Sequence, residues 1–182
     1  MKVLPLYFLI IVLILFEPTK AKVFRVNKMT CQTLDSSLCH FKTCEVVHKE
    51  NGRAALYFHE VIDYKKPIND VLLNLGVFKI LKNRRFQFVN ETLDFCAFSR
   101  QLMFATGIFG FVMAPILNIS NINFSCPIQQ SNIIFNGFVI DENTLKEIPI
   151  PNGVYMFNIR AAYMKRWATD VKIYASRVEK YS

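Results

Sequence analysis

Short stretches of alternating apolar and polar residues run through most of the chain, a pattern typical of β-strands with one buried face. The clearest stretch spans residues 155–163, where every second residue is apolar and the residues between include Asn158 and Arg160. Its apolar positions are Tyr155, Phe157, Ile159, Ala161 and Tyr163. The pattern predicts a long strand that faces the core with its odd-numbered residues.

Further stretches predict shorter strands. They are residues 23–30, 45–50, 53–64, 70–80, 86–88, 133–139 and 171–175. Along residues 53–64, the side chains of Leu56, Phe58 and Ile62 share one face. Asn51-Gly52 just before it favours a two-residue type I′ hairpin turn, because both residues accept positive φ. About eight short strands with turn signals between them predict a mainly β fold, an antiparallel sandwich or cup.

One segment, residues 94–113, instead spaces its apolar residues by threes and fours, which predicts a helix that ends at Pro115. Residues 102–117 carry no charge, but this run is too short to cross a bilayer, and Gly107 and Gly110 weaken the helix. Two interpretations stay open. The segment is either a helix packed on the sheet, or an apolar lid over a cavity or against a membrane.

The first 21 residues have the features of a secretory signal peptide. Lys2 supplies a positive start, Val3 to Phe16 are uncharged and nearly all apolar, and Thr19-Lys20-Ala21 offers small residues for cleavage. The apolar run is too short for a core of roughly 30 Å. We therefore expect residues 1–21 to be removed, residues 22–182 to form a single domain, and the protein to be secreted.

The chain is basic, with a formal net charge of +8 that becomes +7 when Lys2, Glu17 and Lys20 leave with the signal. Outside the cell such a surface meets anionic lipid headgroups, acidic glycans or an acidic partner rather than nucleic acid. Simple solubility is the alternative. The densest cluster, Lys79, Lys82, Arg84 and Arg85, is expected to be a solvated turn between strands.

Seventeen Phe residues require either a thick core or a large apolar cavity. A cavity lined by Phe suits hydrocarbon better than sugar or nucleotide. The candidates to line it are inward positions of the strands and of the helical segment: Phe104, Phe109, Phe135, Phe157, Ile159 and Tyr163. A filled core is the alternative for each of them.

Five cysteines are an odd number, so at least one is free or pairs with another chain. The expected bridges are Cys31–Cys44 and Cys96–Cys126, with Cys39 left over, although the sequence leaves other pairings open. No Cys-x-x-Cys pair exists and the three histidines are not at ligand spacing, so no metal site is expected.

Three Asn-x-Ser/Thr triplets become glycosylation candidates in a secreted chain. They begin at Asn90, Asn118 and Asn123. We expect at least one of them to carry a glycan and all three to lie at the surface.

The residues that catalysis requires are scarce, and we expect neither an enzyme nor a cofactor. The nucleophile elbow, the zinc-protease motif and the phosphate and dinucleotide loops are all absent. His48 and His59 could approach each other across the Asn51-Gly52 hairpin, but cross-strand surface positions explain them as well. Cys39 and His40 are neighbours on a strand, so their side chains are expected to point to opposite faces.

The second half of the chain carries a series of short motifs. They are Asp94-Phe95-Cys96-Ala97-Phe98, Ser120 to Pro127 and Ile148 to Tyr155, and Asn27 to Cys31 and Cys44 fit the same series upstream. In order and spacing the series resembles a large insect family of small secreted proteins of unknown function that includes the CheB chemosensory proteins. That family is in turn similar to the lipid-recognition β-cup proteins, such as the ganglioside activator.

The resemblance implies an immunoglobulin-like β-sandwich or cup of two antiparallel sheets around an apolar cavity. It implies bridge roles for Cys31, Cys44, Cys96 and Cys126, and a turn into a core strand from Pro149 to Tyr155. It also implies non-catalytic binding of a lipid or a hydrocarbon pheromone in chemosensation, with contacts to a membrane surface or a receptor. The alternative function is an extracellular interaction protein that is accessory to a receptor or channel.

Overall fold

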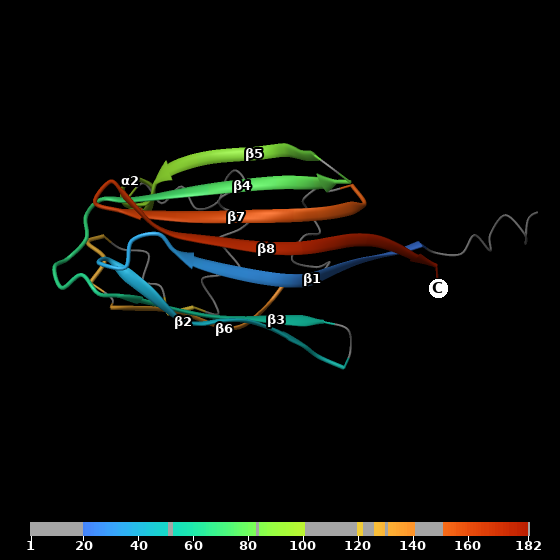
Figure 1. Cartoon of the computed structure of the whole chain (residues 1–182), viewed down its shortest axis with the longest axis horizontal. Helices are drawn as coiled ribbons and strands as arrows, with labels where there is room; N and C mark the ends of the chain where they lie inside the picture. The colour runs from blue at the N-terminus through green and yellow to red at the C-terminus, as the bar shows by residue number, and fades with distance from the viewer. Residues whose placement is uncertain are drawn as a thin grey trace, which may run out of the picture.

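The computed structural model describes residues 20–50, 53–82, 84–100, 120–121, 126–129, 131–140 and 151–181 (Figure 1). Within these ranges it contains eight strands and one helix. The elements are β1 (Lys20–Thr33), β2 (Cys39–His48), β3 (Ala54–Ile62), β4 (Val71–Leu81), β5 (Arg84–Asp94), α2 (Phe95–Arg100), β6 (Asn132–Val139), β7 (Gly153–Tyr163) and β8 (Arg166–Tyr181).

The strands form two sheets, and every neighbouring pair is antiparallel. The five-stranded sheet has the order β1-β8-β7-β4-β5, and the three-stranded sheet has the order β2-β3-β6. The predicted mainly β sandwich with about eight antiparallel strands is therefore confirmed. The first and last strands pair along the large sheet from Lys20↔Tyr181 to Thr33↔Thr169.

The apolar core lies between the sheets in two clusters. The first, which we call the interior cluster, joins buried residues of β1, β3, β4, β7 and β8, among them Val26, Leu56 and Tyr155. The second, the end cluster, contains Leu38, Cys39, Ile62, Val71, Phe95, Cys96 and Tyr163. Because α2 and the ends of β3 and β5 meet there, the end cluster closes one end of the sandwich.

The β2–β3 hairpin is present, but its register differs from that of a two-residue turn. His48 pairs with Ala54, and the backbone N–H of Lys49 donates to the carbonyl of Arg53 at 2.8 Å. Five residues, Lys49 to Arg53, therefore lie between the two strands, a length that is also common in hairpins. As a consequence His48 lies opposite Ala54 and His59 opposite Thr43, so these two histidines do not meet across the hairpin.

The strand over residues 153–163 matches the predicted alternation, but its other face is also covered. Met156, Asn158 and Ala162 are buried, and Arg160 lies over the Trp167 ring at 4.3 Å from its centroid. A Cβ on Gly76 would lie 2.6 Å from the Phe78 ring, so this ring packs over the glycine and next to Asn158. Neighbouring side chains of the same sheet therefore cover residues of β7 that the alternating pattern predicts to be exposed to solvent.

Several expectations fall outside the described residues. They are the signal peptide over residues 1–19, the helical segment beyond Arg100, Phe104, Phe109, Asn118 and Asn123. Strand β1 begins at Lys20, so cleavage after Ala21 would remove its first two residues.

No helix among the described residues is long and apolar enough to span a membrane.

Candidate functional site

Three of the candidate lining residues lie together in the space between the sheets. Phe157 and Ile159 project from β7, the central strand of the large sheet, and Phe135 projects from β6 opposite. Phe157 packs against Phe24 with ring centroids 6.2 Å apart, and Phe135 packs against Phe58 at 5.2 Å. All three are only partly buried, although they face the core. These apolar side chains therefore keep part of their surface exposed, although they pack against the interior cluster.

Tyr163 lies elsewhere, in the end cluster, and is only 2% exposed. Its hydroxyl donates a hydrogen bond to Oε1 of Glu60 at 2.8 Å. Glu60 is on β3, is 3% exposed and lies on the same face as Phe58 and Ile62. A buried carboxyl thus joins the two sheets through a tyrosine.

The surroundings of Glu60 disfavour its charged form. Burial raises the pKa of its carboxyl to about 7, and hydrogen bonds from Tyr163 and Cys39 only partly offset this effect. Burial also raises the pKa values of the Tyr163 hydroxyl and of the Cys39 thiol, and the nearby carboxyl of Glu60 adds to both shifts. A neutral carboxylic acid is therefore the form that this site holds near and below neutral pH.

Cys39 is the free cysteine and is fully buried, with its thiol 3.7 Å from the Ala168 carbonyl. We expect native protein to react extremely slowly with 5,5′-dithiobis(2-nitrobenzoate), because the thiolate neither forms readily nor reaches solvent. In urea, about one thiol per chain should react at once. Fast labelling of the native protein, or a disulfide-linked dimer on a non-reducing gel, would contradict this expectation.

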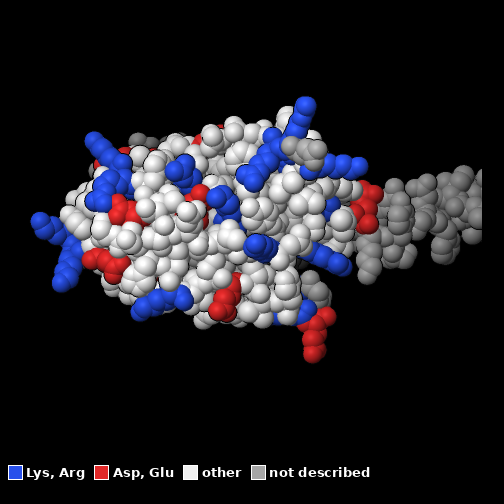
Figure 2. All heavy atoms as spheres, in the orientation of Figure 1, with Lys and Arg blue, Asp and Glu red and all other residues white. Residues whose placement is uncertain are grey.

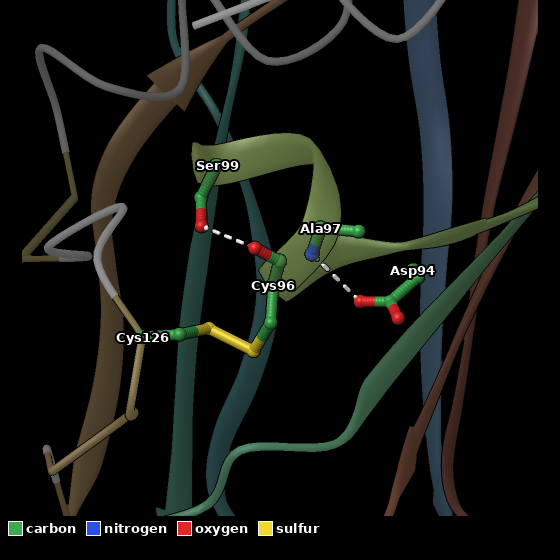
Figure 3. The surroundings of a disulfide bond; sticks show 5 residues. All are labelled: Asp94, Cys96, Ala97, Ser99 and Cys126. Carbon is green, nitrogen blue, oxygen red and sulfur yellow. Dashed lines mark hydrogen bonds between the residues drawn. A yellow bond between two sulfur atoms is a disulfide. The ribbon is translucent and has the colours of Figure 1, made fainter. Parts of the chain in front are cut away.

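The two disulfides clip the sheets at opposite edges and match the expected pairs. Cys31–Cys44 joins β1 to β2, which are edge strands of different sheets. Cys96–Cys126 joins α2, which follows edge strand β5, to the segment that precedes edge strand β6 (Figure 3). Asp94 caps this helix, accepting a hydrogen bond from the backbone N–H of Ala97 at 2.8 Å (Figure 3).

The opposite end of the large sheet leaves apolar side chains exposed. There Lys82 lies between β4 and β5, whereas half-buried Lys79 lies on β4 and Arg84 and Arg85 lie on β5. Most of the basic cluster expected in a solvated turn therefore belongs to the strands. On the same strands Leu81 is 48% exposed, Phe86 57% and Phe88 46%. We call Lys79, Leu81, Arg84, Phe86 and Phe88 the rim. Leu81, Phe86 and Phe88 form an exposed apolar group beside the basic residues of the same strands.

Two histidine side chains are paired with polar neighbours. His40 Nδ1 lies 2.7 Å from Asp63 Oδ2, and His59 Nε2 lies 2.8 Å from Asn132 Oδ1. His40 is exposed while Cys39 is buried, so these neighbours point to opposite faces as expected. Among the described residues no group of three His, Cys, Asp or Glu could hold a metal ion.

Glycosylation candidate Asn90 is exposed on edge strand β5. Its side-chain oxygen accepts a hydrogen bond from Asn74 at 2.9 Å. The sequon remains a prediction.

The residue that the sequence reasoning missed is Glu60. It interrupts the inward-facing series Leu56, Phe58 and Ile62 at an inward position, which is a signal for a buried carboxyl. That signal was available from the alternation alone, without knowledge of its partners.

Comparison with known proteins gives a family match for part of the chain. Residues 73–157 match the family described as "Protein of unknown function (DUF1091)". No curated protein matches the chain. Among solved structures, the chain is similar to the crystal structure of a Niemann-Pick type C2 protein from Japanese carpenter ant, with 13% identity, 87% of this chain and 96% of that chain covered, and a TM-score of 0.31. The family match includes the rim and half of β7, and its description assigns no function.

Proposed function

We propose that the protein is a secreted, non-catalytic binding protein for a hydrophobic small molecule, a lipid or a hydrocarbon. The observation that carries this proposal is the partial exposure of Phe135, Phe157 and Ile159, which pack against the interior cluster from both sheets. A filled core would bury such positions. A chemosensory role, as in the family that the chain resembles, is the finer part of the proposal.

Binding of this kind needs no reactive group. An apolar ligand that hides roughly 300 Å² gains on the order of 7 kcal/mol from burial before the entropic costs of association. Two disulfides that join the sheets at both edges keep the interior ready to receive the ligand. Preorganisation of this kind reduces the cost of binding.

Native mass spectrometry of the secreted, deglycosylated protein tests the proposal directly. A copurifying lipid, or a lipid taken up from an extract, is the expected result. Repeated failure to detect one after incubation with lipid extracts would overturn the proposal.

Filling the interior should abolish uptake. In Ile159→Phe the larger ring occupies the space between the sheets, and we expect at least about tenfold weaker binding of the captured lipid in a fluorescence displacement titration. The matched control is Val47→Phe, which adds a similar ring at a position of β2 that is 43% exposed. If folded Ile159→Phe protein binds like the wild type, the interior is not the binding site.

A second candidate function is that of an extracellular interaction protein, accessory to a receptor or channel. The exposed side chains of Leu81, Phe86 and Phe88 favour it, because such a patch also suits a protein partner. The two candidates differ in outcome: a partner that binds the rim would tolerate Ile159→Phe, whereas an interior ligand would not.

A further inference from the structure

The rim side chains project from the inner face of the large sheet. Phe86 pairs across the strands with Lys79, and Lys79 pairs with Tyr155. Directly paired residues share a face, and Tyr155 belongs to the interior cluster. The rim is therefore an uncovered continuation of the surface that lines the interior, at the end opposite the end cluster (Figure 1).

A bulge in β5 brings Phe88 onto this face as well. Val77 pairs with Val89 but Phe78 pairs with Gln87, so Phe88 has no partner of its own. Such a bulge re-aims side chains. The rings of Phe86 and Phe88 lie 5.0 Å apart, and those of Phe88 and Tyr155 lie 6.1 Å apart. A continuous aromatic surface thus runs from the exposed rim towards Phe157, two residues farther along β7.

Positively charged side chains lie next to this aromatic surface. Lys79 Nζ lies 6.0 Å from the centre of the Tyr155 ring. A Cβ on Gly153 would lie 2.6 Å from Lys79 Cε, so the lysine side chain occupies space that a side chain at position 153 would otherwise fill. Arg177 pairs across from Gly153 and is only 6% exposed. Arg84 pairs with Leu81 at the tip of the same face.

Acidic groups are scarce in this region. Residues 78–89, 151–157 and 174–178 contain no Asp or Glu, and the acidic residues that follow along these strands are Glu91 on β5 and Glu179 on β8. Figure 2 shows several Lys and Arg side chains at this end of the molecule, on the right of the view, together with some Asp and Glu side chains. Among the described residues Lys79 makes no ion pair. The charge that complements this surface is negative.

We propose that the rim binds the headgroup of a single-chain anionic amphiphile, of which a fatty acid is the simplest, and that its chain enters the interior. The carboxylate lies at Lys79 and Arg84, and the hydrocarbon follows Phe86, Phe88 and Tyr155 inward. This inference rests on the proposed function and names its ligand class. A neutral hydrocarbon would gain nothing from the cations, whereas an anionic headgroup forms charge-assisted hydrogen bonds with them.

The test compares dodecanoate with 1-dodecanol, which has the same chain and no charge. Both displace the neutral fluorophore N-phenyl-1-naphthylamine from the full chain at pH 7.4, with dodecanoate kept below its micellar concentration and 1-dodecanol below its solubility limit. We expect dodecanoate to bind about tenfold more tightly than the alcohol, and Lys79→Gln to remove about fivefold of this preference while leaving the alcohol unchanged. Lys42→Gln, an exposed lysine of β2, is the matched control and should change neither affinity.

The outcomes separate this inference from the proposed function. Equal affinities for acid and alcohol, or a preference that Lys79→Gln leaves intact in protein with an unchanged melting temperature, would overturn the anionic headgroup site while the hydrophobic carrier stands. Binding of neither probe, together with no copurifying lipid, would overturn both. A preference for the acid that Lys79→Gln reduces, together with a similar loss of affinity for both acid and alcohol in Phe88→Ala, would support the proposed path from rim to interior.

Discussion

Raising the pH from 5 to 8 is expected to lower the free energy of unfolding by roughly 2–3 kcal/mol through Glu60 alone. Its carboxyl has a pKa of about 7 in the folded protein and the ordinary value of 4.5 when the chain is unfolded. The neutral acid is therefore favoured by folding. The stabilisation is fully present below pH 4.5 and is lost as the pH rises towards 7, because the unfolded chain releases this proton first.

Burial explains why the neutral form of Glu60 is favoured, and the hydrogen bonds from its neighbours offset this effect only in part. Tyr163 on β7 donates a hydrogen bond to the carboxyl, and Cys39 on β2 also hydrogen-bonds to it. Both partners are neutral, and burial is the largest influence on the carboxyl. Two hydrogen bonds from neutral donors do not replace the hydration that an ionised carboxylate loses at 3% exposure.

Urea unfolding followed by the fluorescence of Trp167, the single tryptophan, measures this effect. Glu60→Gln keeps the shape and one hydrogen-bond acceptor but cannot ionise, so its stability should lack the pH-dependent loss that the wild type shows. Tyr163→Phe removes a hydrogen bond that favours the charged form, so the loss should extend to higher pH. A wild type and a Glu60→Gln variant with parallel pH profiles would show that Glu60 is not the titrating group.

The sequence predicts the strands best where one face is buried along the whole strand. β7 follows its alternation from Tyr155 to Tyr163, since its odd-numbered residues all face the other sheet. β5 is much longer than the predicted stretch at residues 86–88, because it is an edge strand whose residues are mostly exposed. The bulge at Phe88 also interrupts the alternation of its apolar residues, so the sequence pattern reveals only part of the strand.

β-Bulges and pairings between distant strands decide which residues face inward, and local sequence patterns do not reveal them. Register shifts lie between Val26 and Lys28, between Val77 and Phe78, and between Ala161 and Ala162. Each shift changes which residue faces inward, and only the partner strand reveals it. The meeting of Glu60 with Tyr163, 103 residues away, likewise depends on the packing of two sheets. The rim became recognisable only when the register placed Lys79 beside Tyr155.

Removing the Cys96–Cys126 disulfide is expected to lower the free energy of unfolding by about 3.5 kcal/mol. The bridge closes a span of 30 residues, against 13 for Cys31–Cys44. The entropy that a crosslink removes from the unfolded chain grows with the logarithm of this span, which gives about 3 kcal/mol for the shorter loop. The expected order of destabilisation is therefore Cys96→Ala/Cys126→Ala above Cys31→Ala/Cys44→Ala.

The two double variants should also differ in what they do to binding. Cys96 is 2% exposed in the end cluster, far along β5 from the rim, so its loss should lower stability and leave lipid affinity nearly unchanged below the unfolding transition. Cys31–Cys44 links the sheets beside the interior cluster, and without it they can separate along the β1–β2 edge. We therefore expect weaker binding in Cys31→Ala/Cys44→Ala despite its smaller loss of stability, measured by urea titration and ligand displacement on the same samples. If both double variants lost affinity in proportion to their loss of stability, this result would contradict a binding site that two disulfide-linked sheets hold open.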